Sequence, residues 1–231
     1  MSQTNPLILL IETSGEVCSV ALAKGKTIVS EVAVEEANTH SKYLASLVQQ
    51  LLIQNALEVN SLDAIAIAGG PGSYTGLRIG CSLAKGLCFG ANIPLIACSS
   101  LKALASSALS NGAKSNKILA LIDARRMVAY AGFFNNKLEE LEEEKFVELD
   151  ADFNNAMIKG ENITAIGNGV DKWLAEFNLP NISIIRHKHL LARHLLFEAL
   201  ECFSSNNFVD VAYYEPNYIK AVYLTKPKPK F

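Results

Sequence analysis

The residues best placed to bind a ligand form a glycine-rich segment from Gly69 to Gly80, which also carries hydroxyl groups. It follows the apolar run 64–68, short enough for a buried strand, and leads into a predicted helix over 77–89. Ser73 or Thr75 can accept a hydrogen bond from a free N–H group at the start of that helix. Such N–H groups and the positive end of the helix dipole favour an anion. A capped turn without a ligand explains the segment equally well.

The glycine-rich segment matches neither of the common phosphate-binding patterns. No Gly-Lys-Ser/Thr follows a four-residue gap, and the glycine spacing is not Gly-x-Gly-x-x-Gly. Gly76 and Gly80 lie four residues apart inside the predicted helix, where each glycine costs roughly 1 kcal/mol relative to alanine. We therefore predict that the backbone of a second helix approaches this face closely.

A second candidate loop follows the first apolar run, 7–11. Glu12, Thr13 and Ser14 supply a carboxylate and two hydroxyl groups there, and the loop backbone can cradle a phosphate. An ordinary hairpin between two strands is the alternative. A third loop, 123–126, follows a later buried strand, and we expect all three loops to point into one cleft.

The four histidines do not form a recognisable metal site. His187 and His189 flank Lys188, and such a pair can ligate zinc from a strand, but no acid or cysteine completes the set. His40 lies at a predicted helix start, where capping or an interface role is favoured over a catalytic one. We therefore predict no metal and no catalytic residue.

Composition predicts a globular protein with a substantial core. Half of the 231 residues are apolar, and the net charge of −2 gives no strong general attraction to nucleic acid. The five cysteines contain no Cys-x-x-Cys pair, which suits a reducing cytosol. No basic segment leads an apolar one at the start, and no run of about 18 apolar residues occurs. We expect a cytoplasmic protein that does not cross a membrane.

Apolar periodicity predicts an α/β protein with two halves of similar element order. The first half reads as three strands, a helix from about Thr39 to Asn55, a strand, a helix, a strand and a helix, which is the order βββαβαβα. A similar order begins again with a buried strand at 118–122. We predict two lobes, residues 1–112 and 113–231, each a mixed sheet with helices.

Several motifs together resemble the TsaB (YeaZ) family of bacterial tRNA-modification proteins. They are Ile11-Glu12-Thr13-Ser14, Cys18-Ser19-Val20-Ala21-Leu22, Asn38-Thr39-His40-Ser41, the segment from Gly70 to Gly80, and Ile122-Asp123-Ala124-Arg125. The resemblance is strong over residues 7–130 and continues weakly to Glu215-Pro216-Asn217-Tyr218-Ile219. It implies the two-lobed actin-like ATPase (ribonuclease H-like) fold.

The resemblance also implies a subunit without an active site of its own. In this family's pathway the catalytic subunit TsaD moves a threonylcarbamoyl group from its adenylate to the adenosine next to the anticodon of tRNA. The ATPase TsaE is a further implied partner. A TsaD-type metal site needs two histidines four apart on a helix, and no histidine pair here has that spacing. We expect no cofactor, contact with tRNA through the complex, and no membrane partner.

Two predicted helices, 43–52 and 77–89, offer a surface for such a partner. Their apolar and small residues spread beyond one narrow stripe, so a face remains to be covered after packing on a sheet. The resemblance implies that these helices meet counterparts in TsaD or in a second copy of this chain, and burial within the lobe is the alternative. The candidate partner-binding residues are Tyr43, Leu44, Leu47, Leu51, Gly76, Gly80, Leu83 and Leu87.

A nucleotide site is the weaker expectation. Kinases of this fold carry an aspartate after the first strand, where this chain has the longer Glu12, so we expect weak nucleotide binding at most. Gly167-Asn168-Gly169 can face an adenine or simply start a helix. The candidate nucleotide or phosphate residues are Glu12, Thr13, Ser14, Gly72, Ser73 and Thr75. The alternative functions are an independent ATP-dependent kinase or ATPase of this fold and a metallopeptidase-like protein.

Two charged segments predict surface roles. Six acids between Glu139 and Glu148 predict a solvated sheet edge that discourages pairing with other strands. The lysine-rich tail, 226–230, either touches tRNA phosphates or is disordered.

Overall fold

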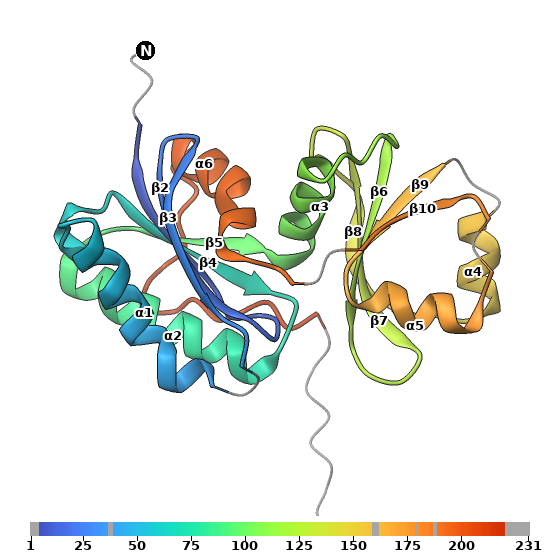
Figure 1. The fold of residues 1–231 in the computed structure, drawn as a ribbon, viewed down its shortest axis with the longest axis horizontal. Helices are drawn as coiled ribbons and strands as arrows, with labels where there is room; N and C mark the ends of the chain where they lie inside the picture. Colours follow the sequence, from blue (N-terminus) through green and yellow to red (C-terminus); the bar gives the residue numbers. More distant parts are fainter. Residues whose placement is uncertain (1–4, 37–38, 159–161, 179, 187–188, 220–231) are drawn as a thin grey trace, which may run out of the picture.

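Two five-stranded sheets with helices form two lobes that lie side by side (Figure 1). The computed structural model describes residues 5–36, 39–158, 162–178, 180–186 and 189–219. The lysine-rich tail and His187 therefore lie outside the described residues.

The first lobe has the element order predicted from the sequence. Its strands are β1 (Leu7–Glu12), β2 (Cys18–Lys24), β3 (Thr27–Val34), β4 (Ala64–Gly70) and β5 (Leu95–Ser99), and its helices are α1 (His40–Gln54), α2 (Tyr74–Ala91) and α3 (Ser100–Ser110), with a short 3₁₀ turn at Val59–Ser61. The sheet order is β3-β2-β1-β4-β5. The first three strands pair antiparallel, whereas β4 and β5 run parallel to β1, as expected for strands that follow crossover helices.

The second lobe repeats this plan. Its elements are β6 (Lys117–Asp123), β7 (Val128–Asn135), β8 (Glu140–Glu148), α4 (Ala151–Ile158), β9 (Ile163–Ile166), α5 (Gly169–Glu176), β10 (Ile182–Ile185), a 3₁₀ turn (Ala192–Leu195) and α6 (Leu196–Ser204). The sheet order is β10-β9-β6-β7-β8, which again places the first strand in the centre between an antiparallel meander and parallel strands.

Each central strand is apolar without interruption because both of its faces are buried. In β1, Leu9 and Ile11 pack towards α1 and α2, whereas Ile8 and Leu10 belong to a central core that both lobes share. The central core also contains Leu101 of α3. A third core covers the outer face of the second sheet around Trp173. Burial on both faces explains why these strands read as continuous apolar runs rather than alternating ones.

The chain returns to the first lobe after β10. The backbone N–H of Ala192 donates to the Ser19 hydroxyl at 2.9 Å, and Arg193 forms an ion pair with Glu31 of β3. Helix α6 then packs beside β5. The division into lobes at residue 112 stays a prediction, and this return path was not foreseen from the sequence.

Residues 207–219, which we call the C-terminal strap, continue across the first lobe. The Val209 N–H donates to the carbonyl oxygen of Leu95 at 3.0 Å, and the Asn217 N–H donates to the carbonyl oxygen of Gly69 at 2.7 Å. The Lys85 ammonium of α2 donates to the carbonyl oxygens of residues 212 and 214 at 2.9 and 3.1 Å. The strap is therefore tied to β5, to the end of β4 and to α2.

The strap explains the paired glycines at the end of β4. A Cβ atom at Gly69 would lie 2.6 Å from the Tyr214 hydroxyl oxygen, and one at Gly70 would overlap the carbonyl oxygen of Asn217. Gly70 also has a φ angle of +112°, which residues other than glycine rarely adopt. Gly70 needs glycine because the backbone of Asn217 lies against it, whereas at Gly69 the Tyr214 side chain occupies the space that a Cβ atom would need.

We predict that Gly70→Ala destabilises the protein by about 2 kcal/mol or more, because it combines steric overlap with backbone strain. Gly86→Ala is the matched control, since Gly86 is exposed on α2 with no atom within 4 Å of the added Cβ. That variant should gain up to about 1 kcal/mol from helix propensity. Urea unfolding measures both changes, and equal stability of the two variants would contradict the packing described for the strap.

Candidate functional site

The start of α2 is capped by a hydroxyl group, as the sequence predicted. The Ser73 hydroxyl accepts a hydrogen bond from the Gly76 N–H at 3.2 Å. The Ser73 N–H in turn donates to the carbonyl oxygen of Ser14 at 2.8 Å. Ser73 is thus the cap, whereas Thr75 is exposed beside it.

The loop between β1 and β2 is organised around the buried carboxylate of Glu12. One carboxylate oxygen accepts from the Ser14 N–H at 2.5 Å, from the Ser14 hydroxyl at 2.6 Å and from the Gly15 N–H at 3.2 Å. The other oxygen has no hydrogen-bond partner among the described residues. Burial raises the pKa of Glu12 from 4.5 to about 7, although the bonds from Ser14 and Gly15 oppose that shift.

The two candidate phosphate loops close on each other. A Cβ atom at Gly72 would lie 2.6 Å from the carbonyl oxygen of Ser14 and 2.7 Å from its Cβ. The N–H groups of Ser14, Ser73 and Gly76 all bond to atoms of these same loops. Thr13 and Ser14 are buried. The Ser73 N–H joins the two loops, whereas the Ser14 and Gly76 N–H groups bond within their own loop, so the donors that would hold a phosphate are already engaged by the protein.

The close approach at Gly76 and Gly80 was predicted correctly, but the approaching element was not. A Cβ atom at Gly76 would overlap the carbonyl oxygen of Thr13, and one at Gly80 would overlap the Thr13 hydroxyl. The neighbour is therefore the β1–β2 loop of the same lobe rather than a second helix. We therefore expect a larger side chain at Gly80 to lower the folding stability of the chain rather than to weaken partner binding directly.

The remaining predicted partner-binding residues divide into two groups. Leu44, Leu47 and Leu51 of α1 are at most 7 % exposed and belong to the core beneath α1 and α2. Tyr43, Leu83 and Leu87 are half-buried, so part of each side chain reaches the surface.

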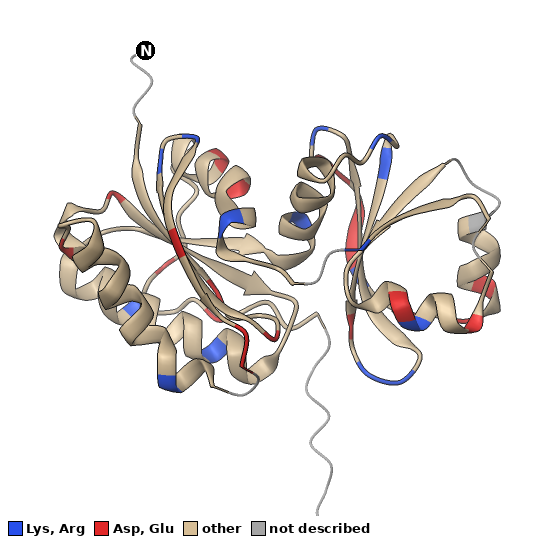
Figure 2. Ribbon diagram, viewed as in Figure 1, with Lys and Arg blue, Asp and Glu red and all other residues tan. Residues whose placement is uncertain are grey.

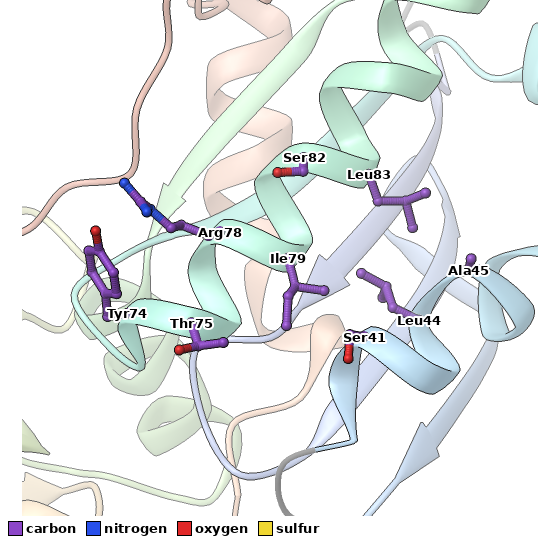
Figure 3. Close-up of a pocket in the computed structure, with 9 residues that line it drawn as sticks. All are labelled: Ser41, Leu44, Ala45, Tyr74, Thr75, Arg78, Ile79, Ser82 and Leu83. Atoms are coloured by element: carbon purple, nitrogen blue, oxygen red, sulfur yellow. The ribbon is translucent and has the colours of Figure 1, made fainter.

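A groove of about 550 Å³ runs between α1 and α2 on the outside of the first lobe. Its lining residues are Ser41, Leu44 and Ala45 of α1 and Tyr74, Thr75, Arg78, Ile79, Ser82 and Leu83 of α2. Figure 3 shows Ile79 and Leu83 pointing towards α1. Sequence reasoning identified only Leu44 and Leu83 as partner-binding residues of this groove. The small or hydroxyl-bearing residues at positions 41, 45, 75 and 82 are the sequence feature that could have revealed the groove.

The strap reaches the same helix at the end of the groove. The ring centroids of Tyr74 and Tyr218 are 4.9 Å apart, and the Arg78 guanidinium lies 4.4 Å from the Tyr74 ring centroid. Aromatic pairs and cation–π contacts of this kind each contribute about 1 kcal/mol. They fix the end of the strap beside the exposed face of α2.

The segment Gly167-Asn168-Gly169 starts α5. The Asn168 side-chain oxygen accepts a hydrogen bond from the Asp123 N–H at 2.8 Å. Gly167 has a φ angle of +112°, and a Cβ atom there would overlap the carbonyl oxygen of Leu121. These contacts support the helix-start alternative for this segment, and the segment serves to tie α5 to β6.

The histidines that the structure describes do not build a metal site. His194 accepts from the Leu191 N–H at 3.0 Å, whereas His40 is buried at the start of α1. Within the described ranges, no group of three or more His, Cys, Asp or Glu is arranged to hold a metal ion. Over the same ranges, no helix combines the length and apolar character needed to cross a membrane.

The acidic strand β8 forms a sheet edge, as predicted, but Glu144 is an exception to its solvation. The Ser99 hydroxyl donates to Glu144, and the Ser99 N–H donates to Glu198 of α6 at 2.8 Å. Burial raises the pKa of both carboxyl groups to about 7. This cluster joins β5, α6 and the second sheet.

Sequence comparison places the chain in a family. A model of the family described as "TsaD: tRNA N6-adenosine threonylcarbamoyltransferase" matches residues 27–220. The TsaB protein of Escherichia coli, named for tRNA threonylcarbamoyladenosine biosynthesis, is 32 % identical over 92 % of this chain and 94 % of its own length. The chain belongs to the TsaB family. The Haemophilus influenzae TsaB is 41 % identical, but that match spans only 54 % of this chain and 52 % of the relative.

Solved structures agree with the predicted fold. YeaZ from Pseudomonas aeruginosa has a TM-score of 0.81 at 24 % identity, covering 92 % of this chain and 99 % of that one. The activator of 2-hydroxyisocaproyl-CoA dehydratase from Clostridium difficile, solved with bound ADPNP, has a TM-score of 0.51 at 11 % identity. The match covers 87 % of this chain and 96 % of the activator chain. At these identities the likeness concerns the fold alone, and it confirms the two-lobed actin-like α/β architecture of this TsaB family member.

We predict that Glu12→Gln gains stability relative to the wild type as the pH rises from 4.5 to about 7. Over that range the folded wild type keeps a proton that the unfolded chain releases, so its own stability falls with rising pH. The variant lacks this loss of stability, and the difference between the two proteins should be on the order of 3 kcal/mol above pH 7. Urea unfolding at several pH values measures it.

The exposed Glu16 of the same loop provides the control, because Glu16→Gln removes an equal charge without altering a buried group. A pH-independent difference between Glu12→Gln and the wild type would show that Glu12 is not protonated by burial.

Proposed function

We propose that this chain is the non-catalytic subunit of the complex that installs threonylcarbamoyl on the adenosine next to the anticodon of tRNA. In this proposal it binds and supports the catalytic subunit TsaD. Membership of the TsaB family supports the pathway, since its relatives are named for tRNA threonylcarbamoyladenosine biosynthesis. The single observation that carries the partner role is the groove between α1 and α2.

The groove has the properties of a site for a partner helix. It is open and lined mostly by apolar or small side chains, with the charged Arg78 and the exposed Tyr74 at one end. Amphipathic helices dock into grooves of this kind through residues spaced three and four apart. Tyr74 and Arg78 are also residue types enriched among those that dominate binding energy.

TsaD is a suitable occupant because it is related to this chain. The family model named for TsaD matches residues 27–220, a range that includes both α1 and α2. Two related proteins can pair through equivalent helices in a near-symmetric interface. The same argument makes a second copy of this chain the alternative occupant, and we include TsaE as a further partner of the assembled complex.

The closed loops support a role without catalysis. Their backbone donors bond within the protein, and the Glu12 carboxyl group has a pKa raised to about 7 by burial. A kinase or ATPase of this fold needs an open loop and an ionised acid at this place. We propose that the chain acts in the cytoplasm, where tRNA is modified, and that it contacts tRNA as part of the complex.

We predict that Ala45→Arg weakens association with TsaD by about tenfold or more, because it places a long charged side chain in the groove. Ala45 is exposed, so the substitution removes no core contact and the melting temperature should stay near that of the wild type. Sedimentation of the purified proteins, alone and mixed, measures the association.

Gln50→Arg is the matched control, since Gln50 is exposed on α1 but does not line the groove. Unchanged TsaD binding by Ala45→Arg, with a normal melting temperature, would remove the groove from the interface.

We further predict that the purified chain forms no threonylcarbamoyladenosine from tRNA and threonylcarbamoyl adenylate. Product should appear when TsaD and TsaE are added, and nucleoside analysis by mass spectrometry measures it. Product formed by the chain alone would overturn the non-catalytic role.

A further inference from the structure

Two consecutive arginines occupy an unusual turn between β6 and β7. Arg125 has a φ angle of +66° and Arg126 one of +48°. Residues with a Cβ atom rarely adopt this left-handed conformation, which glycine and asparagine tolerate better. Two adjacent arginines in it are therefore a backbone feature that needs an explanation.

The turn is held firmly from several sides. The Asp123 carboxylate accepts a hydrogen bond from the Arg125 N–H at 2.7 Å and forms an ion pair with Lys172 of α5. The Lys172 ammonium also donates to the carbonyl oxygen of Arg126 at 2.9 Å and to that of Val128. These contacts use backbone atoms of the arginines rather than their side chains.

Neither arginine side chain has a polar partner within the described part of the chain. Both residues are exposed, and neither guanidinium group forms an ion pair or a hydrogen bond there. Glycine or asparagine would build the same turn with less strain, so the fold does not account for two arginines. Strained residues of this kind cluster at functional sites.

We propose that the Arg125–Arg126 turn binds the phosphate backbone of the tRNA. The planar guanidinium group donates paired hydrogen bonds that match a phosphate, and a rigid turn presents two such groups without further ordering of the backbone. The inference rests on the proposed function, which supplies tRNA as the anion. It adds a contact surface on this chain itself.

The location separates this surface from the protein-binding groove. Figure 1 shows α1 and α2 on the outer side of the first lobe, whereas the β6–β7 loop lies at the tip of the second lobe. In Figure 2 that loop is blue and projects at the same end of the molecule as the loop between β4 and α2. The groove and the arginine turn therefore lie on different lobes.

The test compares the double variant Arg125→Asn/Arg126→Asn with the wild type. Asparagine adopts the left-handed conformation more readily, so the melting temperature should stay the same or rise. Binding of unmodified tRNA should weaken by about tenfold or more, and the slope of log K against log salt should become shallower by about 1.5 to 2. Fluorescence anisotropy across a salt series measures both, for the chain alone and with TsaD.

The control is Lys24→Asn/Lys26→Asn, which removes the same charge from exposed positions in the β2–β3 turn. It should leave the tRNA affinity and the salt slope nearly unchanged. Equal losses in both double variants would indicate a general charge effect and overturn the proposal.

Two further outcomes would also overturn it. Wild-type tRNA affinity in the arginine variant would exclude the turn from the RNA interface. If the variant binds tRNA normally but associates more weakly with TsaD, the turn contacts an acidic protein surface instead. Assembly is measured separately by sedimentation. If wild-type chain and TsaD do not associate, the proposed function fails, and the titration of the chain alone still decides whether the arginine turn binds RNA.

Discussion

The turn between β4 and α2 is held between two distant parts of the chain, and the arrangement of the first lobe depends on that contact. On one side the Ser14 carbonyl oxygen lies against Gly72 and bonds to the Ser73 N–H, and on the other side Asn217 bonds to Gly69. Only residues without a side chain leave room for both approaches. The glycines that suggest a ligand loop are thus required by backbone packing.

This constraint determines which surface is available for function. It fixes the inner face of α2 against Thr13, and it uses the N–H groups that a phosphate would need. The outer face of α2 remains, and together with α1 it forms the groove. In the proposed function, the first lobe serves as a rigid support that presents this pair of helices to a partner.

Local patterns in the sequence predicted much of the fold, whereas distant contacts did not follow from them. The apolar runs of β1 and β6 and the Ser73 cap depend on neighbouring residues, and both were predicted. The return of α6 and the strap depends on contacts such as Ala192 with Ser19, which no periodicity reveals. For the same reason the pattern of α1 could not show whether Leu44, Leu47 and Leu51 face the core or a partner. All three are buried in the core, and Leu44 also lines the groove.

Hydrogen exchange of the full chain, measured with and without TsaD, tests whether the groove between α1 and α2 is the partner-binding surface. Added TsaD should protect the amides of residues 41–45 and 74–83, which include the lining of the groove, and should change the outer face of the second sheet little. Protection confined to the second sheet, with α1 and α2 exchanging as in the free chain, would contradict it.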